Sequence, residues 1–404
     1  MTLNYIAEAY VRLVLAVGKH DPGYVDAYIG PAGWQQEAVQ RPLAELQGEA
    51  AALDKAARAL PLAAPAEAER QQFLQAQVAS VLTYIRMLQG EKFSFDQESQ
   101  ALYDAVSPPL TPADLDQTLA ELNGLVPGSG DLNTRLSVYQ RTFEIPRDRL
   151  DDVFSAAIKE AQARTRMHIA LPDNEHFHVA YVNNQVWSAY NWYKGNAYSL
   201  IEVNTDFPMF ISRAIDLASH EGYPGHHVFN LLIEKELVQE NGWMEYAVYP
   251  LYSPASFLAE GSANYGIDVV FPHAERMVFE KQVLFPLAGI EPSLAERYYQ
   301  IQAVLQKLSY AGNMVAKHYL DGDIGQQEAI AMLMKYSLSD ADRSAQRLRF
   351  IEKNRSYVIN YNLGQDVVKA YVEGRAGTDQ QKRWEVLTDL LRRPKTASMM
   401  MAAS

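Results

Sequence analysis

The spacing of apolar residues predicts helices along most of the chain. From Tyr5 to Val17 they recur at three- and four-residue steps, and the pattern stops at the turn-forming stretch His20–Gly23. Alanine-rich stretches over residues 43–60 and 66–89 continue the helical spacing, as does the segment 147–167. The pattern from Pro208 to about residue 392 is again helical. We therefore expect a mainly α-helical protein.

Residues 176–206 follow a different pattern. Three runs, Phe177–Val182, Trp187–Tyr193 and Tyr198–Val203, are rich in the β-branched and aromatic residues that favour strands. An Asn-Asn pair at 183–184 and a Lys-Gly-Asn triplet at 194–196 separate them and are typical of turns. These runs predict a small antiparallel sheet beside a helix at about 208–237.

The length of 404 residues exceeds the roughly 250–300 residues at which a single core usually stops growing. The stretch Pro127–Gly130 is the best candidate boundary in the N-terminal third. We expect a helical N-terminal subdomain over residues 1–130, a second part over 131–392 that contains the sheet, and a flexible tail over 393–404.

Charge and composition exclude several classes of function. Lys and Arg number 36 against 49 Asp and Glu, a formal charge of -13, so nucleic acid is not an expected partner. Cysteine is absent, which excludes disulfides, thiolate ligands and cysteine nucleophiles and fits a reducing compartment. No apolar run approaches a membrane span of roughly 18 residues, and no basic signal region opens the chain. A cytoplasmic protein with no membrane partner is expected; the pattern indicates no oligomeric state.

The segment Ser219–His227 (Ser-His-Glu-Gly-Tyr-Pro-Gly-His-His) gathers residues that bind metals. Imidazole and carboxylate are the usual zinc ligands where cysteine is missing, and a His-Glu pair followed by a second His on one helix is a zinc-peptidase arrangement with Glu as general base. His220 is thus a candidate ligand and Glu221 a candidate base. The alternative is that His226 and His227 flank a turn and that His220 is a core histidine.

The spacing departs from the standard motif, in which the second His lies four residues on. On an ideal helix His227 would lie roughly 10.5 Å along the axis from His220, and His226 would point about 120° away. Pro224 and Gly225 offer a way out, because a bulge at this Pro-Gly pair could bring His226 to the position of an i+4 ligand. We therefore predict a helix distorted at Pro224, with His226 or His227 as the second ligand.

A third ligand is expected on the helix that starts after Ser253. Glu260 falls in the second turn of this helix among apolar and small residues. A carboxylate on an apolar helix face needs a cation or a proton. Glu260 is therefore the candidate third metal ligand, and a pairing with Arg or Lys is the alternative.

The segment His220–His227 resembles the signature of a bacterial family known as domain of unknown function 885, which is grouped with gluzincin peptidases. Further segments that carry the resemblance are Lys19–Pro31, Tyr190–Tyr193 and Glu202–Asp206. The resemblance implies a helical gluzincin-like fold and a zinc-dependent hydrolase that cleaves peptides. His220, His226 and Glu260 would be the zinc ligands and Glu221 the base. Ser262 stands where that family often has tryptophan.

Helical gluzincins also place tyrosines on a late helix, where they stabilise the oxyanion. Tyr357 and Tyr361 match that pattern because they lie one turn apart on a shared face, and packing is the alternative role. Arg355 is a candidate for binding a substrate carboxylate. The strand Ser199–Thr205 lies where gluzincin-like enzymes run an edge strand that pairs with a peptide substrate.

Other chemistries lack their motifs. The chain has no phosphate-binding loop, no dinucleotide fingerprint and no serine nucleophile elbow. Three functions stay open: a zinc peptidase acting on short peptides, a zinc hydrolase of another amide or ester, and a binding protein without turnover. His and carboxylate ligands also accept manganese or cobalt.

Overall fold

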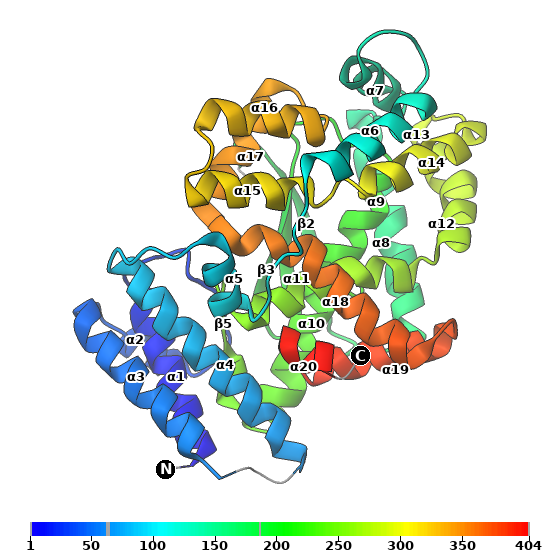
Figure 1. Ribbon diagram of the computed structural model, residues 1–404. Coiled ribbons are helices and arrows are strands. Elements are labelled where there is room, and N and C mark those ends of the chain that lie inside the picture. The colour runs from blue at the N-terminus through cyan, green and yellow to red at the C-terminus, as the bar shows by residue number, and fades with distance from the viewer. Residues whose placement is uncertain (1, 62–64, 186, 403–404) are drawn as a thin grey trace.

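Helices make up most of the computed structural model, which describes residues 2–61, 65–185 and 187–402 (Figure 1). The α-helices before the sheet are α1 (Leu3–Val17), α2 (Ala32–Glu37), α3 (Leu43–Ala59), α4 (Pro65–Leu88), α5 (Phe95–Tyr103), α6 (Pro112–Leu125), α7 (Leu132–Arg141) and α8 (Leu150–Arg166). Those after it are α9 (Ser212–Leu217), α10 (His226–Leu232), α11 (Pro254–Val270), α12 (His273–Phe279), α13 (Phe285–Ala288), α14 (Ala295–Gln306), α15 (Ala311–Asp321), α16 (Gln326–Tyr336), α17 (Ala341–Asn354), α18 (Ile359–Ala376), α19 (Gln380–Arg392) and α20 (Ala397–Ala402). The expected mainly α-helical fold is confirmed.

Within the described residues, shorter helical segments join these helices. Three are π-helical: η2 (Ala218–Gly222), η3 (Ile233–Glu240) and η5 (Glu280–Leu284). Four are 3-10 turns: η1 (Arg147–Arg149), η4 (Met244–Ala247), η6 (Pro292–Leu294) and η7 (Arg355–Val358). In the described part of the chain, no helix is both long enough and apolar enough to cross a membrane.

The three expected strands form, as β2 (His176–Val182), β3 (Ala189–Gly195) and β4 (Tyr198–Asn204). Their order in the sheet is β2-β4-β3. The Lys-Gly-Asn triplet turns β3 into β4 as an antiparallel hairpin, with positive φ at Gly195 and Asn196. The segment after β2 instead crosses over, so β2 runs parallel to β4. The sheet is therefore mixed rather than antiparallel, and β4 is its central strand rather than the edge strand expected over Ser199–Thr205.

Two further strands join distant parts of the chain. β1 (Val25–Tyr28) pairs antiparallel with β5 (Val248–Pro250). Nearby, the buried side chains of Arg70 and Glu245 form a two-pronged ion pair, with 2.9 Å between Arg70 Nη2 and Glu245 Oε2. The buried apolar side chains on both sides of residue 130 form one continuous cluster. The expected subdomain boundary at this residue stays a prediction, and these contacts cross it.

Helices α11 and α18 cross at the centre of the fold (Figure 1). A Cβ atom added to Gly261 of α11 would lie 2.4 Å from the carbonyl oxygen of Gly364 of α18, so the crossing requires the absence of a side chain. Glu260 on α11 contacts Tyr357 of η7, the turn that leads directly into α18.

The C-terminal segment is ordered by contacts, which corrects the flexible tail expected over residues 393–404. Residues 397–402 form α20, in which Met400 is fully buried. The backbone N–H of Ser398 donates to Asp104 at 3.0 Å. The apolar Met-Met-Met run, which the sequence predicts to be part of a flexible tail, therefore contributes a core residue. Residues 403 and 404 lie outside the described residues.

Candidate metal centre

The chain leaves regular helical geometry where the Pro-Gly pair predicts it. Helix α9 ends at Leu217, and the next turn, η2, has π-helical geometry. Tyr223 is extended, with φ −122° and ψ 111°, and the peptide bond that joins it to Pro224 is cis. A new helix, α10, begins at His226. The expected distortion at Pro224 is confirmed.

Gly225 allows the chain to fold back tightly onto η2. Its N–H donates to the carbonyl of Ser219 at 2.9 Å. A Cβ atom at this position would lie 1.8 Å from the carbonyl oxygen of His220, so no residue with a side chain fits here. As a result, Nε2 of His226 lies 3.1 Å from Nε2 of His220.

Glu260 of α11 completes a group of three. Its Oε2 lies 3.3 Å from His220 Nε2 and its Oε1 lies 3.7 Å from His226 Nε2. In a tetrahedral zinc site with ligand bonds of 2.0–2.1 Å, neighbouring ligand atoms lie about 3.3 Å apart. Within the residues that the structure describes, this trio is the group whose ligand atoms converge closely enough to hold a metal ion. The spacing fits zinc.

The electrostatics of the trio also favour a cation. Burial disfavours the charged form of Glu260, but His226 and His220 outweigh this and hold its pKa well below the usual range. Burial likewise lowers the pKa of His226, yet Glu260 and Glu221 raise it to about 9. Oε2 of Glu260 is buried with no hydrogen-bond partner among the described residues. A metal ion would satisfy this oxygen and replace the proton on His226.

Neighbouring side chains orient two of the three ligands. The amide Nδ2 of Asn264 donates to the carbonyl of Tyr361 at 2.7 Å, so its Oδ1 faces Nδ1 of His220 at 2.9 Å. His220 therefore donates from Nδ1 and keeps its Nε2 lone pair free for a metal. Tyr357 donates to Oε1 of Glu260 at 2.7 Å. This is the supporting shell that metal ligands usually have.

Glu221 lies beside the trio on the wall of a cavity of about 1040 Å³. Its backbone is fixed, because Asn191 of β3 donates to its carbonyl at 2.7 Å. Its side chain is buried, and in the described parts of the chain no hydrogen bond or ion pair engages it. The cavity volume is at the upper end of ordinary ligand pockets. A free carboxylate next to a potential metal position has the placement of a general base.

The two candidate tyrosines have different environments. Both line the cavity, and their rings meet edge to face with centroids 5.7 Å apart. The hydroxyl of Tyr357 donates a hydrogen bond to Glu260. The side chain of Tyr361 is half-buried, and its hydroxyl is the better placed of the two to donate to a ligand. Arg355 also lines the cavity, but its guanidinium is 2.6 Å from the buried carboxylate of Glu98.

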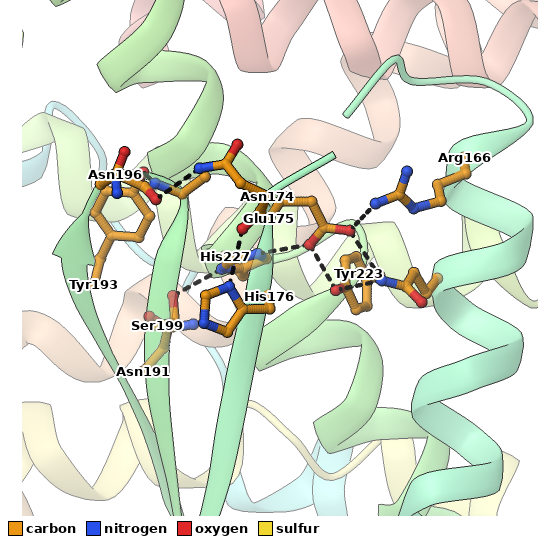
Figure 2. A network of polar contacts seen from close by, with 12 residues as sticks. Arg166, Asn174, Glu175, His176, Asn191, Tyr193, Asn196, Ser199, Tyr223 and His227 are labelled. Atoms are coloured by element: carbon orange, nitrogen blue, oxygen red, sulfur yellow. Dashed lines mark hydrogen bonds and ion pairs between the residues drawn. The ribbon is translucent and has the colours of Figure 1, made fainter. Parts of the chain in front are cut away.

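His227, the alternative ligand, points away from the trio. Nδ1 lies 2.8 Å from Ser199 Oγ, and Nε2 lies 3.1 Å from Glu175 Oε2. Figure 2 shows the Glu175 carboxylate between His227 on one side and Tyr223 and Arg166 on the other. Ser199, His227 and Glu175 have the connectivity of a serine-hydrolase triad, but all three are buried and none lines the cavity. The network therefore has a structural role and anchors the loop beside His226.

Asp26 is a cavity residue to which the sequence patterns assign no role. Burial raises its pKa to about 7, although His226 opposes the shift. Tyr190 of β3 donates a hydrogen bond to its carboxyl group. In the sequence, one signal could have pointed to Asp26 and Tyr190: both lie in segments that carry the family resemblance.

No family model matches the sequence, and no curated protein matches it. Among solved structures, the fold is similar to that of a protein from Colwellia psychrerythraea named a "putative lipoprotein", at 14% sequence identity and a TM-score of 0.54. The match covers 89% of this chain and 65% of that protein, so the chain spans just under two thirds of its length. This likeness shows a shared fold alone, and the family resemblance stays a prediction.

Proposed function

We propose that the protein is a metal-dependent hydrolase, with zinc as its ion and short peptides as its substrates. The observation that carries the proposal is the convergence of three ligand atoms beside the unpaired carboxylate of Glu221 in one large cavity. His220, His226 and Glu260 would hold the ion.

A zinc ion bound there would supply Lewis acidity and lower the pKa of a bound water toward 7. Glu221 takes a proton from the attacking water and later passes it to the leaving amine. Tyr361 donates its hydroxyl to the carbonyl oxygen as negative charge develops there. Asn264 and Tyr357 keep His220 and Glu260 oriented throughout.

The position of strand β3 at the cavity favours a peptide as the substrate. β3 is an edge strand of the sheet, and its residues Ala189–Trp192 line the cavity. An extended peptide can add to such an edge through backbone hydrogen bonds. This role falls to β3 in place of β4.

We further infer a cytoplasmic location, because a chain without cysteine fits a reducing compartment. Its net charge of -13 argues against nucleic acid as a partner.

The proposal is tested by metal content and turnover measured on the same preparations. Protein purified without chelator should contain about one zinc per chain by elemental mass spectrometry, and His220→Ala should lose it. A peptide library should yield cleaved products with the parent protein. Glu221→Gln should keep the metal and lose nearly all cleavage. Full activity of Glu221→Gln, or metal content unchanged by His220→Ala, would contradict the proposal.

A further inference from the structure

One wall of the cavity is formed by α17, which carries two arginines on one face. Arg343 and Arg347 are one turn apart and both line the cavity, together with Gln346 and Phe350 of the same helix. In Figure 1 this helix lies at the upper left, drawn in orange. Two cations at i and i+4 repel each other, so the pair is destabilising unless an anion lies between them.

Neither guanidinium has a carboxylate partner in the described parts of the chain. Arg343 lies over the ring of Phe207 at 4.9 Å, and Arg347 over that of Phe350 at 5.2 Å. The chain has 49 carboxylate residues for 36 Lys and Arg, so partners are not scarce. Arg355, elsewhere on the cavity wall, has its own buried partner in Glu98.

Arg347 lies close to the proposed reacting centre. Burial lowers its pKa, and the neighbouring phenol of Tyr361 is the group that opposes the shift. Arg347 and Tyr361 line the same cavity as Glu260 and Glu221. Because an arginine side chain stays charged, a half-buried guanidinium without an anion is incompletely stabilised. Since none of the described residues supplies that anion, an anionic ligand bound in the cavity would stabilise the guanidinium.

We propose that Arg347, with Arg343 beside it, binds a carboxylate of the substrate on the Tyr361 side of the metal ligands. This inference rests on the proposed function and names its substrate class: short peptides or N-acylated amino acids that carry a free carboxylate. A planar guanidinium donates two parallel hydrogen bonds to a carboxylate, and this pairing fixes the substrate's orientation and contributes to its affinity. The carboxylate-binding role foreseen for Arg355 thus passes to Arg347.

The test is a binding measurement that needs no turnover. Three ligands are titrated calorimetrically into zinc-loaded Glu221→Gln protein: benzoyl-glycyl-phenylalanine, its C-terminal amide, and benzoyl-glycyl-glutamic acid α-amide, whose one free carboxylate is on the side chain. The free acid should bind at least about tenfold more tightly than the amide. The third ligand distinguishes a C-terminal carboxylate from an acidic side chain as the group recognised.

Variants assign the effect to Arg347. In Arg347→Gln the preference for acid over amide should disappear, and Arg347→Lys should restore part of it. Arg349→Gln, on the exposed face of the same helix, is the matched control and should keep the full preference. Thermal melts check that each variant is folded.

Acid and amide that bind equally, or do not bind, to protein containing one zinc would overturn the inference while leaving the hydrolase proposal intact. A preference unchanged in Arg347→Gln would overturn it as well. The opposite outcome is also possible to detect. If the protein never holds zinc but still prefers the acid in a way that depends on Arg347, the carboxylate site is supported and the hydrolase proposal is contradicted.

Discussion

His226 Nε2 lies 3.1 Å from His220 Nε2 although the two residues are six positions apart in the chain. A straight helix would turn these side chains about 120° apart. The extended Tyr223 and the side-chain-free Gly225 replace the regular turn, and the second histidine is delivered by a new helix that begins at His226. The proposed metal site therefore depends on one loop of three residues.

Gly225→Ala should destroy this geometry. The added methyl would lie 1.8 Å from the carbonyl oxygen of His220, so the loop must move. We expect zinc to be lost and the free energy of unfolding to fall by about 1–3 kcal/mol. Elemental mass spectrometry and urea unfolding measure the two effects.

Gly374→Ala is the matched control for this change. It lies exposed on α18 with no atom within 4 Å of the added methyl, so it should leave metal content unchanged and raise stability by up to about 1 kcal/mol. If Gly225→Ala kept both zinc and stability, the loop would have another geometry in solution.

Sequence patterns foresee this loop because proline and glycine act on the backbone locally. The same holds for the three strands and most helices, which follow short-range spacing. The parallel pairing of β2 with β4 depends on a crossover, which residue composition does not encode. For the same reason the sequence predicts the edge strand at β4, whereas the structure has β3 at the edge.

The supporting shell could not be foreseen. Asn264 contacts His220 across 44 residues and Tyr361 across 97, and nothing in the local pattern marks it. The sequence gives no way to tell Arg355 from Arg347. Both line the cavity, but only the fold shows that Arg355 is paired with Glu98, whereas Arg347 has no carboxylate partner among the described residues.

Asn264→Ala should weaken zinc binding by about 10- to 100-fold without removing a ligand. The substitution frees Nδ1 of His220, so the ring loses its fixed orientation and tautomer. Competition with a chelator measures the dissociation constant. Ser262→Ala on the same helix is the control, because its hydroxyl donates to the carbonyl of Ala259 rather than to a ligand. Equal zinc affinity in both variants would remove Asn264 from the supporting shell.

Replacing Tyr357 and Tyr361 by phenylalanine should affect different properties, zinc affinity in the first case and kcat in the second. Tyr357→Phe removes the hydrogen bond to Glu260, so zinc affinity should fall by about tenfold. Tyr361→Phe should leave zinc affinity unchanged and lower kcat by about a hundredfold, because it removes a donor to the oxyanion. Chelator competition and steady-state kinetics separate the two. A loss of kcat in zinc-saturated Tyr357→Phe with no change for Tyr361→Phe would reverse the assignment.

The buried network in Figure 2 makes stability depend on pH through Glu175. Burial opposes its ionisation, but hydrogen bonds from His227, Tyr223 and Arg166 outweigh it and lower its pKa from 4.5 to about 2. A depressed carboxyl pKa stabilises the fold above pH 4.5, and this stabilisation is lost as pH falls toward 2. Glu175→Gln should thus be less stable than the parent by on the order of 2 kcal/mol at pH 7, and the gap should close toward pH 2–3.

Urea unfolding with chelator present measures this gap without a contribution from bound metal. Glu240→Gln, at an exposed position, should stay within about 0.5 kcal/mol of the parent at every pH. A gap for Glu175→Gln that stays constant from pH 7 to 3 would mean that the loss comes from altered packing around His227 and not from the charge. A gap that closes on acidification assigns to the ionised carboxylate of Glu175 the anchoring of the loop that carries His226.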